Sequence, residues 1–196
     1  MKIKLLFLVV LTGCVFITSA QESNQEQPAK KGCSCSFSSI TQAGDLYGSK
    51  GTYLQIQTIN GIRYKTWFAG IGAGIDFYTR GGFPVFLDVR KDIFEKRSTP
   101  FLYVDGGIHL VRDRKEEVTQ WYQNTYSNGF YGDAGMGYKL DLHGAGRLLV
   151  SAGYSYKNIN RRYEYVSSCP TSRCYENYYT YKNYLHRLSV KLGLQF

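Results

Sequence analysis

The chain closes with Leu188-Ser189-Val190-Lys191-Leu192-Gly193-Leu194-Gln195-Phe196, in which apolar residues alternate with polar or small ones without a break. Neighbouring side chains of a β-strand point to opposite faces, so this stretch predicts a strand with one apolar and one polar face. Lys191 falls on the polar face, and Arg187 continues that face upstream. The strand ends on the aromatic Phe196, which is rare at the end of a soluble domain.

The same alternation recurs along the rest of the chain. The chain length is sufficient for one domain. Of the 196 residues, 16% are aromatic, including 18 Tyr, and 21 are Gly. Aromatic residues favour strands and glycines favour tight turns, so we expect an all-β protein. Within the second segment, Asn60-Gly61 is interpreted as a bulge rather than a hairpin turn. The eight predicted segments are 37–46, 52–63, 66–79, 83–94, 100–112, 129–142, 147–159 and 185–196.

The N-terminus has the layout of an export signal. Lys2 and Lys4 precede an uncharged, mostly apolar run over 5–17. This run is too short to span a bilayer, which needs about 20 residues. We expect residues 1–20 to be a signal peptide that is removed by cleavage after residue 20. The residues around Cys14 also resemble a lipidation motif, so lipidation at Cys14 is the alternative.

Residues 21–36 are polar and aperiodic, which predicts a flexible periplasmic lead-in before a folded domain over 37–196. Without the two lysines of the signal, the 24 basic residues fall to 22, against 15 acidic ones. The charges are dispersed and the chain is exported, so nucleic acid is not an expected partner. A positive surface suits the phosphates of lipopolysaccharide, and a generally solvated surface is the alternative.

Four cysteines remain after cleavage: Cys33, Cys35, Cys169 and Cys174. An oxidising compartment permits disulfides, and we expect a bridge between Cys169 and Cys174 that closes a small loop. Cys33 and Cys35 are too close together for an easy local bridge. No histidines lie at metal-ligand spacings, so no metal or other cofactor is expected.

Charges of both signs on the polar faces of the strands indicate which face of the sheet would line the inside of a barrel. Their burial in a soluble core is costly unless every charge is paired, whereas around a narrow lumen they can pair with one another and with water. With the apolar faces toward lipid, the sheet must close, because lipid cannot satisfy an open sheet edge. We therefore expect an all-β, eight-stranded antiparallel up-and-down transmembrane β-barrel rather than a soluble lipocalin-like ligand binder. The expected lumenal charge network consists of Asp88, Arg90, Asp105, Lys139, Arg187 and Lys191.

Loop lengths predict the orientation of this barrel. Periplasmic turns of outer-membrane barrels are short and outer loops are longer. From a periplasmic N-terminus, the connections at 47–51, 80–82, 113–128 and 160–179 fall outside, and those at 64–65, 95–99 and 143–146 fall inside. Both long connections are then external. The protein is expected in the cell outer membrane, with Phe196 at the periplasmic interface.

Five motifs in the predicted strands also carry a resemblance. They are Thr58-Ile59-Asn60-Gly61, Gly70-Ile71-Gly72-Ala73-Gly74-Ile75, Phe83-Pro84-Val85-Phe86-Leu87-Asp88-Val89-Arg90, Pro100-Phe101-Leu102-Tyr103-Val104-Asp105-Gly106-Gly107 and the closing strand. Together they resemble the small, porin-like outer-membrane β-barrel proteins of the Bacteroidetes type. The resemblance covers roughly 50–196 and implies fold and location. It brings no catalytic residues to this chain.

Some eight-stranded outer-membrane barrels modify lipid A, so the three histidines are candidates for catalysis. His109 shares the polar face of its strand with Asp105, but no serine is obviously placed beside them; His143 lies in a turn and His186 on an apolar face. A hydrolase needs Ser, His and a carboxylate to converge. No enzyme activity is therefore expected, with lipid A modification as one alternative and a narrow channel as another. Because eight strands leave little free width, we expect ion pairs to plug the lumen.

The fourth outer connection and its flanks are rich in tyrosine and arginine. These residues dominate recognition surfaces, and tyrosine also forms the aromatic belt of membrane barrels, so both interpretations stay open. We expect a structural or surface-binding role through the extracellular loops, with outer-membrane lipid and lipopolysaccharide as partners. The barrel-assembly machinery is expected to bind the C-terminal strand that ends at Phe196. The tyrosines concerned are Tyr163, Tyr165, Tyr175, Tyr178, Tyr179 and Tyr181.

Overall fold

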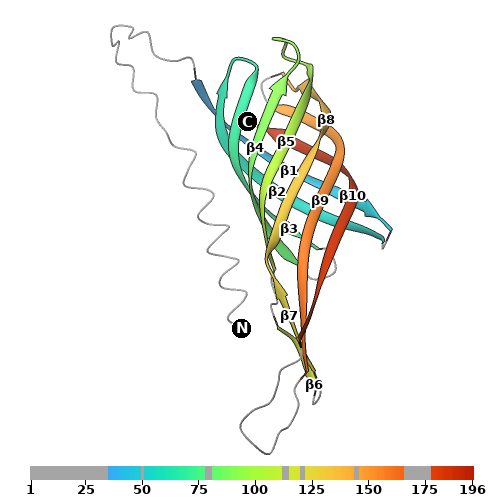
Figure 1. The fold of residues 1–196 in the computed structure, drawn as a ribbon. Coiled ribbons are helices and arrows are strands. Elements are labelled where there is room, and N and C mark those ends of the chain that lie inside the picture. Colours follow the sequence, from blue (N-terminus) through green and yellow to red (C-terminus); the bar gives the residue numbers. More distant parts are fainter. Residues whose placement is uncertain are drawn as a thin grey trace, which may run out of the picture. The chain divides into compact units, whose positions relative to one another are not determined.

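The computed structural model describes residues 35–49, 51–77, 81–111, 115–119, 122–143, 146–165 and 178–196. The signal peptide, the lipidation motif at Cys14 and nearly all of the lead-in lie outside these ranges. The described residues form ten strands (Figure 1): β1 Cys35–Gly48, β2 Gly51–Tyr64, β3 Trp67–Asp76, β4 Gly82–Asp92, β5 Thr99–Val111, β6 Lys115–Thr119, β7 Tyr122–Ser127, β8 Gly129–Asp141, β9 Arg147–Tyr165 and β10 Tyr178–Gln195. No helix in the described part of the chain is long and apolar enough to cross a membrane.

Eight of the strands form a closed barrel. The order is β10-β1-β2-β3-β4-β5-β8-β9, and the pairing of β9 with β10 closes the ring. Each neighbouring pair is antiparallel. The prediction of an all-β, eight-stranded antiparallel barrel is thus confirmed by the strand pairing.

The register of the pairs fixes the stagger of the strands. A path of directly paired residues leaves β10 at Gln195, crosses β1 at Ile40 and returns to β10 at Leu185, ten residues away. A stagger of ten over eight strands tilts them by about 40° from the barrel axis. At this size the interior has room for side chains and little else.

The alternation predicted from the sequence places apolar side chains on the outer wall. In β10, Leu188 is 64% exposed and Leu192 is 56% exposed, while Ser189 and Lys191 between them are 1% and 3% exposed. The barrel strands β2, β3, β4, β5, β8 and β9 also place apolar side chains outside, among them Ile71, Leu87 and Val104. The inner side of these strands carries charged and polar side chains together with a few large apolar ones, unlike the apolar interior of a soluble lipocalin-like barrel.

Strand β1 departs from this outward placement of apolar side chains. Its apolar Ile40 and Leu46 are buried inside the barrel, whereas the alternate positions of β1 include Thr41 and Asp45. The strand also begins at Cys35, within the predicted lead-in. Its place in the ring comes from pairing with β2 and β10 rather than from a clean alternation of its own.

The bulge predicted at Asn60-Gly61 is wrong. The register of β2 with both β1 and β3 continues through these residues without a shift. The glycine is required by a close approach of the neighbouring strand, because a Cβ atom at Gly61 would lie 2.2 Å from the carbonyl oxygen of Ala69. A glycine inside a strand can mark such a close approach of another backbone as well as a bulge.

Beyond one end of the barrel, β9 and β10 continue as a pair that reaches Glu164 and Tyr178. Strand β7 pairs with β9 and β6 pairs with β7, so these segments form an open sheet that we call the outer sheet (Figure 1). Two predicted loops, 113–128 and 160–179, thus contain strands, which corrects the sequence interpretation. The short connections after β2, β4 and β8 all lie at the opposite end, which we call the turn end.

Candidate functional site

The barrel interior holds equal numbers of opposite charges. Among the described residues, five acidic and five basic side chains are buried, so the interior is neutral when all are ionised. Six of these ten were predicted as a lumenal network, and the structure places all six inside the barrel. The ten residues are Asp76, Asp88, Asp92, Asp105, Asp133, Arg90, Lys139, Lys157, Arg187 and Lys191.

Three of the carboxylates form a row across the middle of the wall. Asp88, Asp105 and Asp133 are direct register partners on β4, β5 and β8. Like charges this close repel one another unless cations lie between them. Arg90 supplies one cation, since its Nε lies 3.0 Å from both oxygens of Asp88. Lys191 supplies the other, with Nζ 2.9 Å from Asp133 and 3.7 Å from Asp105.

A chain of hydrogen bonds carries this network to the opposite wall. Arg90 Nη2 donates to the Gln42 side-chain oxygen at 3.1 Å, and Gln42 Nε2 donates to the Gln57 side-chain oxygen at 2.7 Å. Gln57 Nε2 then donates to the hydroxyl oxygen of Tyr131 at 2.9 Å. The chain joins β4, β1, β2 and β8, so it bridges the lumen instead of following its wall. Such a cross-link places polar side chains across the interior.

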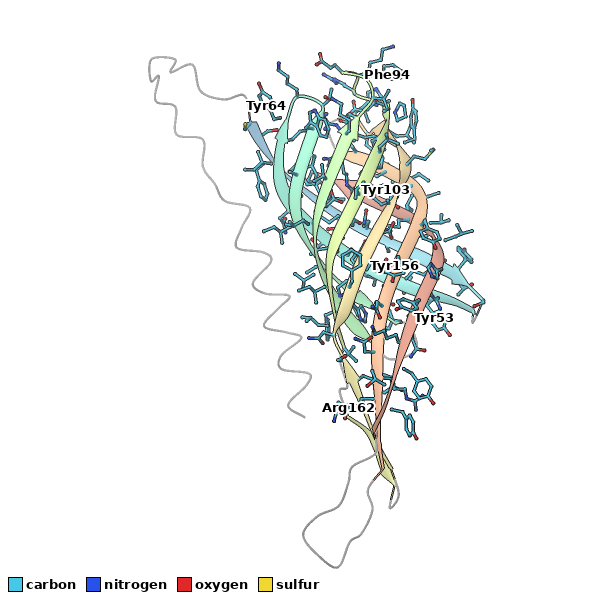
Figure 2. The ribbon with its side chains drawn as sticks, viewed as in Figure 1. Tyr53, Tyr64, Phe94, Tyr103, Tyr156 and Arg162 are labelled. Carbon is cyan, nitrogen blue, oxygen red and sulfur yellow. The ribbon has the colours of Figure 1, made fainter. Side chains whose placement is uncertain are left out.

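Strands β5 and β10 meet at a second polar contact around Asp133. Tyr103 donates its hydroxyl proton to Asp133 Oδ1 at 2.9 Å, and Ser189 donates to the same oxygen at 3.2 Å. The ring of Tyr103, which Figure 2 labels within the barrel, also lies 4.9 Å from Lys191 Nζ. Asp133 Oδ1 thus accepts two hydrogen bonds, which compensate for its burial.

Two further ion pairs occupy the ends of the interior. At the turn end, Asp92 accepts from Arg63 at 2.9 Å and from Lys139 at 2.8 Å. At the outer end, Asp76 pairs with Lys157 and lies 3.8 Å from His109 Nε2. The interior is therefore crossed by ion pairs at three levels.

Apolar side chains fill the space between the polar contacts. One buried cluster contains Ile40, Ile59, Phe68, Phe86 and Tyr131, with the rings of Phe86 and Tyr131 at 5.3 Å. A second contains Phe101, Tyr103 and Leu149. These large groups occupy the width that eight strands leave.

Two members of the network differ from expectation. Arg187 donates to the carbonyl oxygen of Leu46 at 3.3 Å and lies over the ring of Tyr53, so it ties β10 to β1 and β2. Lys157 was not anticipated at all, although it continues the polar face of Ser151 and Ser155. The spacing of Lys157 from Ser155 is consistent with an inward position. However, the flanking Tyr156 and Asn158 are not clearly apolar, so the alternation that would indicate this position is interrupted.

The histidines lie apart from one another. His109 is buried and points into the barrel as predicted, but its carboxylate neighbour is Asp76 rather than Asp105. His143 lies in the turn after β8 with a φ of 48°. His186 faces outward, where it contacts the hydroxyl of Tyr154 and packs 5.2 Å from the ring of Tyr156. Among the described residues, no three His, Cys, Asp or Glu side chains are grouped to hold a metal ion.

The outer sheet presents aromatic and basic side chains to its surroundings. Tyr179 and Tyr181 of β10 are both more than half exposed. On β9, Arg161 lies 5.4 Å from the ring of Tyr126 on β7, and Arg162 lies well beyond the barrel (Figure 2). Tyr163, Tyr165 and Tyr178 belong to the paired strands of this sheet. The predicted Cys169–Cys174 bridge and Tyr175 lie outside the described residues.

Comparisons with known proteins add little to this description. No protein-family profile matches the sequence, and no curated protein matches it either. A solved structure that it resembles is the outer membrane protein AlkL, determined by solid-state NMR in DMPC lipid bilayers. The two chains are 12% identical over 89% of this chain and 97% of that one, with a TM-score of 0.32. The architecture described above therefore rests on the strand pairing of this chain itself.

Proposed function

We propose that this chain is an outer-membrane β-barrel whose interior is plugged by ion pairs and which acts at the cell surface through its outer sheet. The observation that carries the proposal is the inversion of the barrel: leucines and isoleucines cover the outside while ten charged side chains fill the inside. A soluble monomer rarely exposes a continuous apolar surface of this extent. A lipid-facing wall needs one, and a closed ring leaves no sheet edge unsatisfied in lipid.

Aromatic residues near both ends of the barrel support this placement. Tyr64, Trp67 and Phe94 are exposed near the turn end, and Tyr154 and Tyr184 are exposed toward the outer sheet. Rings of this kind anchor a barrel at the two membrane interfaces. We assign the belt to tyrosines on the barrel wall, such as Tyr154 and Tyr184, and propose that the exposed Tyr179 and Tyr181 of the outer sheet are available for binding.

The short turns favour a periplasmic turn end and an extracellular outer sheet. The last strand, β10, is followed by Phe196, which exchanges backbone hydrogen bonds with Ser39 of β1. The Phe196 ring is exposed, so it is accessible to a partner that recognises the C-terminal strand. We propose that the barrel-assembly machinery recognises this strand and that lipopolysaccharide surrounds the opposite rim. The Bacteroidetes-type origin rests on the sequence motifs alone.

A binding role is favoured over transport and catalysis by the same interior. The chain of hydrogen bonds from Arg90 to Tyr131 bridges the lumen where an ion would have to pass. His109, the buried histidine, is 2% exposed and lies where no lipid substrate can reach it. We therefore propose neither a conducting pore nor a lipid A-modifying site. Removal of residues 1–20 by signal cleavage is part of the same proposal.

Cell fractionation and a gel-shift assay test the membrane placement. We expect the protein in the outer-membrane fraction, with faster migration on gels before heating than after it, as for a folded barrel. Recovery from the soluble periplasm would contradict the proposal.

Lysine labelling on intact cells tests the orientation. A membrane-impermeant acylating reagent should modify Lys182, which is exposed on the outer sheet, before the cells are permeabilised. Lys65 and Lys96, exposed at the turn end, should react only afterwards. The reverse order, read by peptide mass spectrometry, would invert the orientation.

A further inference from the structure

A pocket at the turn end lies outside the sites described so far. Its volume is about 440 Å³, within the range of small-molecule sites. The turn after β2, the connection after β4 and the start of β9 bring its walls together from three parts of the sequence. The lining residues are Arg63, Lys65, Thr66, Glu95, Lys96, Arg97 and Arg147.

The pocket is strongly basic, with five cationic side chains against one carboxylate. Two of the cations have partners beyond its wall, Arg63 with Asp92 and Arg97 with Asp141. The charge of Asp92 is already matched by the buried Lys139. The contact between Arg97 and Asp141 is long, at 3.7 Å, and solvent-exposed, so it neutralises little. An excess of positive charge therefore remains.

The pocket lies beside exposed aromatic residues of the barrel wall. Tyr64 and Phe94, which flank its lining residues in sequence, lie at the same end of the barrel (Figure 2). Trp67 follows Thr66 directly and holds the ammonium of Lys91 4.6 Å from its ring. Exposed aromatic rings of a membrane barrel lie at the level of the lipid headgroups. In that setting, the basic pocket opens at the depth of the headgroup phosphates.

We propose that this pocket binds a phosphate group. The planar forks of Arg97 and Arg147 suit phosphate oxygens, which accept two parallel N–H bonds. Lys65 and Lys96 add point charges, and Thr66 adds a hydroxyl. The group can come from an anionic phospholipid headgroup or from a free phosphate in the surrounding water. The lipid source rests on the proposed membrane location, whereas the phosphate chemistry does not.

Native mass spectrometry of the folded barrel in dodecyl maltoside, a detergent without phosphate, tests this. We expect the mature chain to retain phosphatidylglycerol and not diacylglycerol, which has the same acyl chains without the phosphate. The triple variant Lys96→Gln, Arg97→Gln, Arg147→Gln should bind phosphatidylglycerol about tenfold or more weakly. The matched control Arg161→Gln, Arg162→Gln, Lys182→Gln removes as many charges from the outer sheet and should stay within about twofold of the unaltered chain.

Inorganic phosphate, titrated by calorimetry in the same detergent, separates the two sources. If millimolar phosphate displaces phosphatidylglycerol, the pocket recognises the phosphate group by itself. If the lipid is retained and phosphate does not bind, the pocket recognises the phospholipid headgroup. Binding of neither ligand, equal losses in the two triple variants, or equal retention of diacylglycerol would overturn the proposal. These outcomes leave the membrane placement untouched, because cell fractionation tests that separately.

Two measurements keep the proposal testable if the triple variant does not fold. Lys65→Asn removes one charge where the φ of 53° suits asparagine, and we expect about threefold weaker binding. On the unaltered chain, phosphatidylglycerol should protect Lys65 and Lys96 from acylation while leaving Lys182 reactive. Protection of Lys182 to the same degree would contradict a site at the turn end.

Discussion

The barrel and the outer sheet are built from the same strands, yet they obey different rules. Within the barrel, β9 and β10 separate an apolar outer face from a polar inner face, as Leu188 at 64% exposed and Ser189 at 1% exposed show. Beyond it, the same two strands expose neighbouring residues alike, including Lys182 and Asn183. Alternation in sequence therefore follows from the two environments that a strand separates, and it is lost where both faces meet the same solvent.

Loss of one interior charge should produce the largest difference between the two regions. Lys191→Met leaves Asp105 and Asp133 without their shared cation, and we expect it to lower the free energy of unfolding by about 3–5 kcal/mol. Lys182→Met makes the same replacement in the outer sheet and should change it by less than about 0.5 kcal/mol. Guanidinium unfolding of both variants in detergent measures the effects. Similar values for the two would refute an ion-paired interior.

A pair of adjacent glycines tests the close approach of strands within the barrel. A Cβ atom at Gly107 would lie 2.1 Å from the carbonyl oxygen of Val85, whereas one at Gly106 meets nothing within 4 Å. We expect Gly107→Ala to destabilise the barrel by about 1–3 kcal/mol and Gly106→Ala to be neutral or slightly stabilising. The gel migration of unheated samples, followed with temperature, reports the difference. Equal melting of the two variants would show that the strands can separate to accept a methyl group.

Hydrogen exchange should divide β9 and β10 at the rim of the barrel. Ser151 and Ser189 have register partners on both sides of their strands within the closed ring, so we expect their amides to exchange slowly. Amides near Arg162 and Thr180 belong to the open sheet and should exchange faster by about two orders of magnitude or more. Uniform protection along both strands would mean that the outer sheet is as stable as the barrel.

The smallest effect is expected for the exposed tyrosines of the outer sheet. Tyr181→Ser should change barrel stability by about 0.5 kcal/mol or less, because the side chain is 57% exposed. The same variant should reduce binding of whole cells to a surface ligand if the outer sheet carries recognition, and cell-adhesion assays can measure this. A large loss of stability instead would assign Tyr181 to the support of the sheet.

Much of the barrel could be predicted from sequence because the outer wall and the lumen impose opposite demands on alternate residues. Strands β3, β4 and β5 show this, since each charged residue at a polar-face position is buried inside. Strand β1 could not be read in the same way, because Ile40 and Leu46 fill the lumen and its outer face is mixed. Lys157 was missed since its neighbours Tyr156 and Asn158 are not clearly apolar.

The basic pocket could not have been predicted by the same reasoning. Arg63, Lys96 and Arg147 are far apart in the sequence and come together only through the paths of three turns. Turn conformation is not encoded in alternation, so the sequence revealed the lengths of these connections but not what they enclose.

The seam between β1 and β10 sets a condition on how the barrel can form. It joins residues up to 158 positions apart, as between Ser38 and Phe196, whereas every other wall pair can form between strands closer along the chain. Until this seam is made, both edge strands present unpaired backbone groups that lipid cannot satisfy. For the proposed outer-membrane location, we therefore expect insertion into the bilayer to be coupled to closure of the ring, with the most distant contact in the chain completing it.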